Sequence, residues 1–200
     1  MNDVPTGVFV HPLGLCESSA VGAGTRVWAF AHVMPRAVVG TDCNICDHAF
    51  IEDGVVIGNG VTVKNGVMIF SGVIVGDRAF LGPGVIFTNG MRPRAFLKGD
   101  DAPLLETWID EGATLGAGTV VVCGHRVAEY AFVGAASVVT RDVPEYAFVK
   151  GNPAHQDGWV CRCGQRLDRE LRCACGERYR TGAPYGGLRR DETVEATPTN

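Results

Sequence analysis

Four cysteines near the carboxyl end of the chain have the spacing of a metal site. They form two Cys-x-Cys pairs, Cys161 with Cys163 and Cys173 with Cys175, and a glycine follows each pair. Four thiolates are the ligand set of a structural, tetrahedral zinc ion, and such a closed site leaves no open position for catalysis. Two disulfides are the competing interpretation. We expect zinc, because the amino-terminal sequence lacks a signal peptide and thus favours a reducing compartment.

The other four cysteines lie earlier in the chain. Cys43 and Cys46 have the Cys-x-x-Cys spacing of a redox pair or a zinc knuckle. The repeat described below places Cys43 inside the fold and Cys46 at a corner, so that their side chains should diverge. We therefore expect these two residues, together with Cys16 and Cys123, to pack as ordinary small residues.

Three histidines are candidates for acid–base chemistry, because an imidazole titrates near neutral pH. His32 and His48 are expected to point outward, where either could be a general base in a groove between subunits or a polar interface group. His125 occupies an inward position and is expected in the core or an interface. A γ-carbonic-anhydrase-like zinc site would need three converging histidines, and these three lie on different coils. His11 and His155 are expected at the surface, near the ends of the repeat.

The composition excludes several classes of protein. The 27 glycines among 200 residues follow no Gly-X-Y period and therefore indicate frequent turns rather than collagen. A formal net charge of −4, with no basic arm, argues against a nucleic-acid partner. No apolar stretch approaches the roughly 20 residues needed to cross a bilayer, which argues against a membrane partner. We expect a cytoplasmic protein.

A six-residue repeat must position all of these side chains. Every sixth residue is apolar from Leu15 to Phe87, and the pattern resumes from Ile109 to Val139. Four places after each apolar anchor stands a small or β-branched residue, with His125 as the exception, and a glycine often follows the anchor. A period of six fits neither an isolated strand nor a helix. It predicts a prism with three flat sides, in which three hexads complete each coil.

The expected fold is therefore all-β: a parallel β-helix whose coils stack at the spacing of neighbouring strands. Residues 1–156 should form this domain, with candidate caps at 2–14 and 144–156. Residues 157–181 should form the cysteine module, and the polar residues 182–200 should be a mobile tail. Inert β-helical scaffolds exist, but they have no need of a metal module or of the extruded loop described next.

Residues 88–108 break the register and must leave the prism as a loop. A loop of about twenty residues within a strict repeat is usually functional. Arg92 and Arg94 flank Pro93 within it, and their guanidinium groups could bind phosphates, although loop charges are also commonly solvated. We expect the active site beside this loop.

Residues 15–154 resemble the hexapeptide-repeat acyltransferases, and this resemblance implies that the β-helix is left-handed. The strings CNICDHAFIE (43–52), VTVKNGV (61–67), FLGPGVIFTNG (80–90) with RPR (92–94), and DVPEYAFVKGNPA (142–154) carry the resemblance. They are similar to N-acetyltransferases that act on nucleotide-linked 3-amino sugars, including UDP-2-acetamido-3-amino-glucuronate acetyltransferases. The resemblance implies a homotrimer with sites between subunits, acetyl-CoA as co-substrate, and direct attack of an acceptor amine on the thioester.

The resemblance also suggests roles for individual residues. Asn89 would hold the acceptor amine, and Glu52 and Lys64 would contact the acceptor or remain solvated at their corners. The family pattern has carboxylates where this chain has Ser71 and Gly90. CoA would lie along the later coils, against Gly116, Ala117, Gly134 and Ala135, and Arg141 and Lys150 would face its phosphates.

We therefore expect an acetyl-CoA-dependent N-acetyltransferase whose acceptor is a nucleotide-linked amino sugar. Because Ser71 and Gly90 replace carboxylates, the alternative is a non-sugar amine, hydrazine or hydroxyl acceptor from a secondary-metabolite pathway. A γ-carbonic-anhydrase-like metalloenzyme is the third hypothesis.

Overall fold

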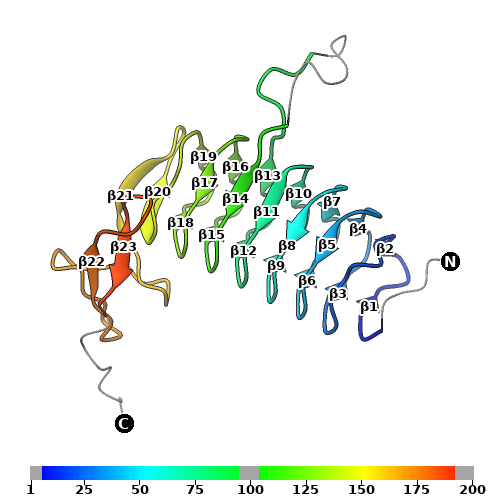
Figure 1. The fold of residues 1–200 in the computed structure, drawn as a ribbon, viewed down its shortest axis with the longest axis horizontal. Helices are drawn as coiled ribbons and strands as arrows, with labels where there is room; N and C mark the ends of the chain where they lie inside the picture. The colour runs from blue at the N-terminus through cyan, green and yellow to red at the C-terminus, as the bar shows by residue number, and fades with distance from the viewer. Residues whose placement is uncertain (1–5, 95–103, 192–200) are drawn as a thin grey trace.

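The chain folds as a parallel β-solenoid in which each coil adds one short strand to each of three sheets (Figure 1). The computed structural model describes residues 6–94 and 104–191. Within those ranges the regular structure consists of strands, and no helix there is long and apolar enough to span a bilayer. The all-β class is confirmed, and the architecture is consistent with the predicted left-handed β-helix.

Successive strands go to the three sheets in turn. The nine-stranded sheet contains β1 (Phe9–Val10), β3 (Arg26–Val27), β6 (Asn44–Ile45), β9 (Thr62–Val63), β12 (Phe80–Leu81), β15 (Thr114–Leu115), β18 (Phe132–Val133), β20 (Ala147–Lys150) and β21 (His155–Trp159). The seven-stranded sheet contains β2 (Leu15–Cys16), β4 (His32–Val33), β7 (Phe50–Ile51), β10 (Met68–Ile69), β13 (Ile86–Phe87), β16 (Val120–Val121) and β19 (Val138–Val139). The five-stranded sheet contains β5 (Val38–Val39), β8 (Val56–Ile57), β11 (Val73–Val75), β14 (Thr107–Ile109) and β17 (Arg126–Val127).

Backbone hydrogen bonds run along the axis and keep equivalent residues in register. Arg26 pairs with Asn44, and Asn44 pairs with Thr62, so each partner lies one 18-residue coil away. The bond from the Arg26 amide to the Cys43 carbonyl, 2.9 Å long, is one of many of this kind. Residues at the same place in successive coils therefore form columns along the prism.

The apolar anchors fill the interior as predicted, except in the first coil. From Val21 to Val139 the anchors are at most 6% exposed and belong to one continuous core. Leu15, the first predicted anchor, is instead 51% exposed, and Cys16 packs against the core in its place. The reason is that Leu15 pairs with His32, so the first coil is one residue shorter than the rest and its inward position shifts by one.

The interruption of the repeat projects from the side of the prism between β13 and β14 (Figure 1). It ends earlier than predicted, because Thr107 and Trp108 already belong to β14 and pair with Val73 and Ile74 of β11. Residues 95–103 of the predicted loop lie outside the described residues.

The two ends of the prism differ from the predicted caps. Residues 9 and 10, within the predicted first cap, form β1 and pair with β3. At the other end β20 extends the nine-stranded sheet in parallel, and β21 folds back antiparallel to it. This reversal covers an edge that would otherwise expose unpaired backbone groups.

A small module follows β21 at the far end of the prism (Figure 1). It contains two similar turns, closed by the bridges Val160–Arg166 and Arg172–Arg178, and a hairpin of β22 (Tyr179–Thr181) and β23 (Leu188–Arg190). The predicted boundary at residue 182 falls inside this hairpin, where Leu188 is 1% exposed. Residues 192–200 of the expected tail lie outside the described residues.

Replacing an anchor should destabilise the protein far more than replacing its neighbour on the same strand. Leu115→Ala removes a fully buried side chain, so we expect the free energy of unfolding to fall by about 2–5 kcal/mol. Thr114→Ala, on the outer face of β15, should change it by less than about 1 kcal/mol. Denaturant unfolding of both variants measures this difference, and equal losses would contradict the assigned inward face.

Candidate functional site

Two corners of the prism carry most of the predicted site residues. The first, called the loop corner, lies where the chain passes from the seven-stranded to the five-stranded sheet, at residues 52–53, 70–71, 88–90 and 122–125. The second, called the glycine corner, lies between the nine-stranded and seven-stranded sheets, at residues 28–30, 46–48, 64–66, 82–84, 116–118 and 134–136. The seven-stranded sheet separates the two corners.

The loop corner brings Glu52 and Ser71 together. One oxygen of the Glu52 carboxylate accepts the Ser71 amide at 2.8 Å and lies 3.0 Å from the Ser71 hydroxyl. That hydroxyl also lies 2.7 Å from the carbonyl of Asp53. Since the bonds involve one carboxylate oxygen, they fix the orientation of Glu52 and leave its second oxygen to receive a ligand donor.

Asn89 stands one coil after Ser71 in the same column, because β10 and β13 are paired in register. Its side chain is half-buried, at the point where the loop leaves the prism. Gly90 follows it, and a Cβ placed there would meet no atom of the described residues within 4 Å, so these residues leave this part of the corner open. Arg92 and Arg94 are exposed, and Arg94 donates to the Pro93 carbonyl at 3.0 Å.

The glycine corner contains Lys64, Gly116, Ala117, Gly134 and Ala135. A Cβ at Gly116 would lie 2.5 Å from the Ala135 amide nitrogen, so the close stacking of coils requires glycine here. The presence of Gly116 is therefore no signal for a ligand. Ala117 and Ala135 are exposed, and they leave this part of the corner without large side chains.

The two cations predicted to bind CoA phosphates have partners of their own. Lys150 donates to Asp157 at 2.8 Å, and this hydrogen bond holds the pKa of Asp157 below its usual value. Arg141 lies 3.4 Å from the His155 ring and borders a cavity of about 190 Å³. Both cations lie near the end of the prism, beyond the coils that form the loop corner.

The structure separates the three histidines of the prism. His32, on β4, lies 2.7 Å from the Glu17 carboxylate, and His48, at the glycine corner, stacks on Phe30. His125 lies at the loop corner, in the coil that follows Asn89. Within the described chain they do not converge as a metal site would require.

His125 is the candidate that the sequence undervalued. Its inward position predicted a core or interface group, but its side chain is 25% exposed and lies 3.6 Å from the Asp142 carboxylate. The coil opens here because an imidazole is too large for a slot that elsewhere holds small residues. The signal was visible as the one exception in that column of small residues.

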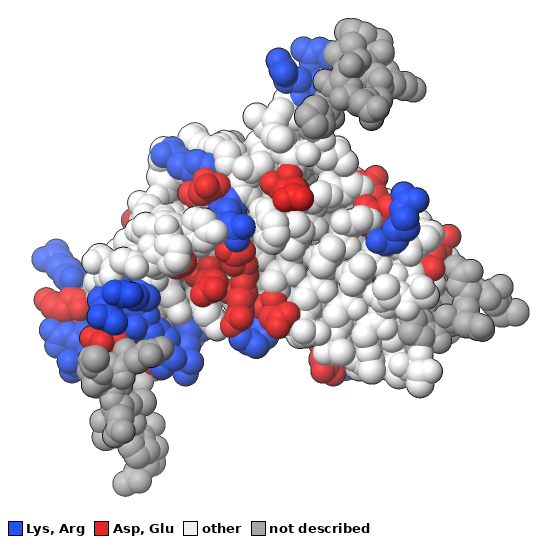
Figure 2. Space-filling view, in the orientation of Figure 1, with Lys and Arg blue, Asp and Glu red and all other residues white. Residues whose placement is uncertain are grey.

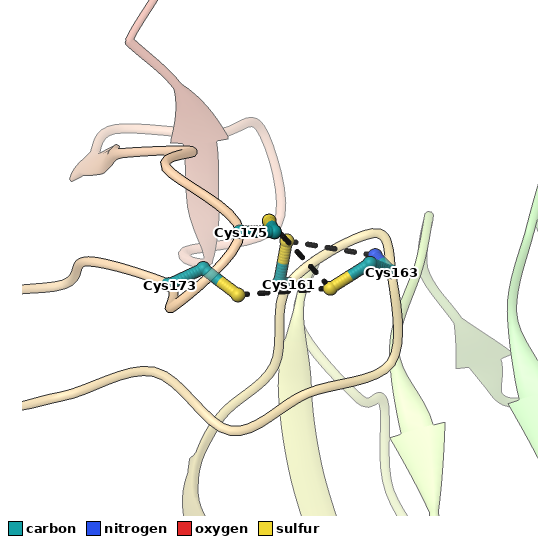
Figure 3. A group of neighbouring side chains, drawn as sticks. All are labelled: Cys161, Cys163, Cys173 and Cys175. Atoms are coloured by element: carbon teal, nitrogen blue, oxygen red, sulfur yellow. Dashed lines mark hydrogen bonds between the residues drawn. The ribbon is translucent and has the colours of Figure 1, made fainter. Parts of the chain in front are cut away.

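The four tail cysteines converge on one point (Figure 3). Three of their sulfur–sulfur distances are 3.6, 3.6 and 3.7 Å, and all four sulfurs lie within 4.8 Å of one another. The cysteines are free, and these separations far exceed the roughly 2.05 Å of a disulfide. They match the edge of a ZnS₄ tetrahedron, which is about 3.8 Å for a Zn–S bond of about 2.3 Å.

The surroundings of the sulfurs suit a metal site. The hydroxyl of Tyr179 donates to the Cys161 sulfur at 3.1 Å, as outer groups commonly do around metal ligands. A backbone hydrogen bond from Glu177 lowers the pKa of Cys175 to about 7 and so favours the thiolate that zinc binds, whereas burial raises the pKa of Cys173 to about 12 and by itself opposes it. Cys16, Cys43, Cys46 and Cys123 are free thiols of the prism and take no part in this cluster.

The module packs tightly on the last coils. The rings of Tyr130, Tyr146 and Tyr179 follow one another at 5.3 and 4.8 Å, and Arg126 lies between Trp108 and Tyr185. A cavity of about 450 Å³ remains between prism and hairpin. Lys and Arg side chains gather over the module, and Asp and Glu lie on the adjoining prism (Figure 2).

Comparison with known proteins finds relatives among characterised acetyltransferases. The chain is 49% identical over 181 residues to a dTDP-3-amino-3,6-dideoxy-α-D-galactopyranose 3-N-acetyltransferase of Aneurinibacillus thermoaerophilus, covering 86% of this chain and 90% of the relative. No family model matches the chain.

Two solved structures share the fold. An N-acyltransferase of Bacillus cereus, AntD, in complex with dTDP-4-amino-4,6-dideoxyglucose and coenzyme A, has a TM-score of 0.59 at 16% identity, covering 68% of this chain and 80% of that one. The acetyltransferase domain of PglB from Neisseria gonorrhoeae has a TM-score of 0.55 at 21% identity, covering 74% of this chain and 57% of that one. At these identities the likeness concerns the fold alone.

The identity to the Aneurinibacillus enzyme extends over most of both chains, and the β-solenoid carries the strings that first suggested the resemblance. The protein belongs to the hexapeptide-repeat N-acetyltransferases of nucleotide-linked amino sugars.

Proposed function

We propose that this protein transfers the acetyl group of acetyl-CoA to the 3-amino group of a dTDP-linked 3-amino-3,6-dideoxyhexose. The observation that carries the proposal is the 49% identity, over most of the chain, to an enzyme named for that reaction. The loop corner adds support, since it joins a fixed carboxylate, a half-buried amide and open space at Gly90. A non-sugar amine, hydrazine or hydroxyl acceptor is the alternative, since Ser71 and Gly90 depart from the family pattern.

The chemistry needs a neutral amine aimed at the thioester carbonyl. As the bond from nitrogen to the acetyl carbon forms, the carbon–sulfur bond breaks, and CoA leaves as the thiol after taking up the proton that the amine loses. Asn89 would accept a hydrogen bond from the amine through its side-chain carbonyl and orient the nitrogen lone pair. Glu52, held by Ser71, would bind a hydroxyl of the sugar. No covalent enzyme intermediate is required.

Each active site would be built from two copies of the chain. Asn89 lies at the loop corner, whereas Ala117 and Ala135, where CoA is expected, lie at the glycine corner on the other edge of the seven-stranded sheet. Within one copy, the seven-stranded sheet lies between the two corners. Closed cyclic assembly would bring the loop corner of one copy to the glycine corner of the next, which supports the homotrimer implied by the resemblance.

We also propose that Cys161, Cys163, Cys173 and Cys175 bind a structural zinc ion, which would fasten the two similar turns of the module together. The tetrahedral spacing of their sulfurs and the Tyr179 hydrogen bond support this assignment. The cytoplasmic location expected from the sequence stays a prediction.

Asn89→Ala should abolish the positioning of the amine without unfolding the protein. Because Asn89 is half-buried at a corner, we expect an unchanged melting temperature and a fall in kcat of about 100-fold or more. The assay follows thiol release from acetyl-CoA with the dTDP-linked amino sugar, and Thr114→Ala serves as a remote control. Wild-type activity in Asn89→Ala would remove this residue from the site.

Two inactive variants should restore each other if sites lie between subunits. Asn89→Ala removes the side chain proposed to orient the amine at the loop corner, and Ala135→Trp fills an exposed part of the glycine corner. Coexpressed in equal amounts, they should recover about a quarter of the wild-type rate, since about one interface in four joins the two intact corners. Activity no higher than the sum of the separate variants would show that each chain holds a complete site.

Metal analysis tests the cysteine cluster. Purified wild-type protein should contain about one zinc ion per chain, and Cys161→Ser should lose it. Cys16→Ser, in the prism, should keep it. Retention of zinc in Cys161→Ser would contradict the assignment and return attention to a histidine site within the β-helix.

A further inference from the structure

We propose that the stacked rings of Phe30 and His48 form a platform for the nucleobase of the acceptor, so that the nucleotide lies along the glycine corner. This inference rests on the proposed function, because it takes the acceptor to be a nucleoside-diphosphate sugar. It assigns His48 to binding, in place of the catalytic role that its outward position first suggested.

The backbone at this corner is unusual for such large side chains. Phe30 and His48 both have a φ of 60°, and the residues at the same place in the next two coils are Gly66 and Gly84. Bulky side chains rarely adopt this conformation. Core packing does not explain them, since Phe30 is 55% exposed and His48 is also exposed. The same position of the hexad has a positive φ in other coils, at Arg78 and Tyr130 for example, so the coil sets the backbone conformation and the feature to explain is the pair of exposed aromatic rings.

The two rings define a stacking direction that continues past His48. Their centroids are 4.9 Å apart and their planes differ by 13°, so they stack at about the spacing of successive coils. The next coil places Gly66 beside His48, since the Gly66 amide donates to the Asp47 carbonyl. Among residues 6–94 and 104–191, no atom lies within 4 Å of a Cβ placed at Gly66 or at Gly84. A third planar ring can therefore lie on the free face of His48.

A lysine lies at the same corner as the open face of His48. Lys64 lies two residues before Gly66, at the same corner, and its side chain is half-buried. An aromatic platform next to an ammonium group suits a ligand that carries both a planar base and phosphates. Two co-substrates of the proposed reaction fit that description, the dTDP-sugar and CoA. We assign the platform to the dTDP moiety, because the exposed residues expected to hold CoA, Ala117 and Ala135, lie at least two coils further along this corner.

The decisive variants replace Phe30 and His48 by glycine, the residue that stands at the same place in the next two coils. His48→Gly and Phe30→Gly remove the aromatic groups and should fold normally, because glycine suits a positive φ. Asp42→Gly, at φ 55° on a different corner, is the matched control. His48→Phe keeps a planar ring and removes the imidazole. For each variant we would measure the binding of dTDP alone, the binding of CoA alone, kcat and the KM for the dTDP-sugar.

In His48→Gly, we expect the affinity for dTDP to fall about tenfold or more, with a similar rise in KM. CoA binding and kcat at saturation should stay within about threefold of wild type. His48→Phe should retain dTDP affinity, and Asp42→Gly should match wild type throughout.

Unchanged dTDP affinity in His48→Gly would overturn the inference. So would a selective loss of CoA binding, which would assign the platform to the donor, or a loss of assembly in sedimentation, which would make the rings an interface between copies. A large fall in kcat in both His48→Gly and His48→Phe, with dTDP affinity retained, would return His48 to catalysis. A wild-type protein that binds dTDP through these rings but transfers no acetyl group would refute the proposed function and leave this site standing.

Discussion

The hydrogen-bond ladder along the prism axis is the constraint on which everything else in this molecule depends. Each coil is joined to the next by backbone bonds such as Trp28 to Ile45, so a residue lies over its counterpart one coil away. The residues proposed for the active site therefore lie in columns of equivalent positions. The column of Glu52, Thr88 and Val122 and its neighbours make the loop corner, and a second set makes the glycine corner.

The same constraint explains which parts of the fold could be predicted from the sequence. Each anchor meets another anchor above and below it, so the six-residue period alone identifies the interior. The prediction was wrong at Leu15, because the first coil is one residue shorter than the others. A periodic pattern cannot show that a single coil is shorter, so the inward position was assigned one residue too early. It was incomplete at His125, because the exception in the column of small residues marks an unusual position but does not decide between a buried imidazole and one that is partly exposed beside Asp142.

Side-chain partners were beyond the reach of sequence patterns. Glu52 and Ser71 were each predicted at the acceptor site, but their hydrogen bond depends on a contact between coils. Lys150 was predicted to face phosphates, and its bond to Asp157 arises only because β21 folds back over the end of the prism. The cysteine cluster was predictable, since the symmetry of its spacing survives in the two similar turns. The extent of the module could not be predicted, because the polar sequence around Leu188 gives no sign of the hairpin in which this residue is buried.

Acetyl transfer to a nucleotide-linked amine is the central claim, and labelled acetyl-CoA tests it most directly. The protein would be incubated with acetyl-labelled CoA and a dTDP-linked 3-amino-3,6-dideoxyhexose, and the products separated and identified by mass spectrometry. The account predicts label in an amide on the 3-amino group, with one CoA thiol released for each amide formed. Label that remains on CoA with this acceptor and with every other amino-sugar nucleotide in a panel would contradict it.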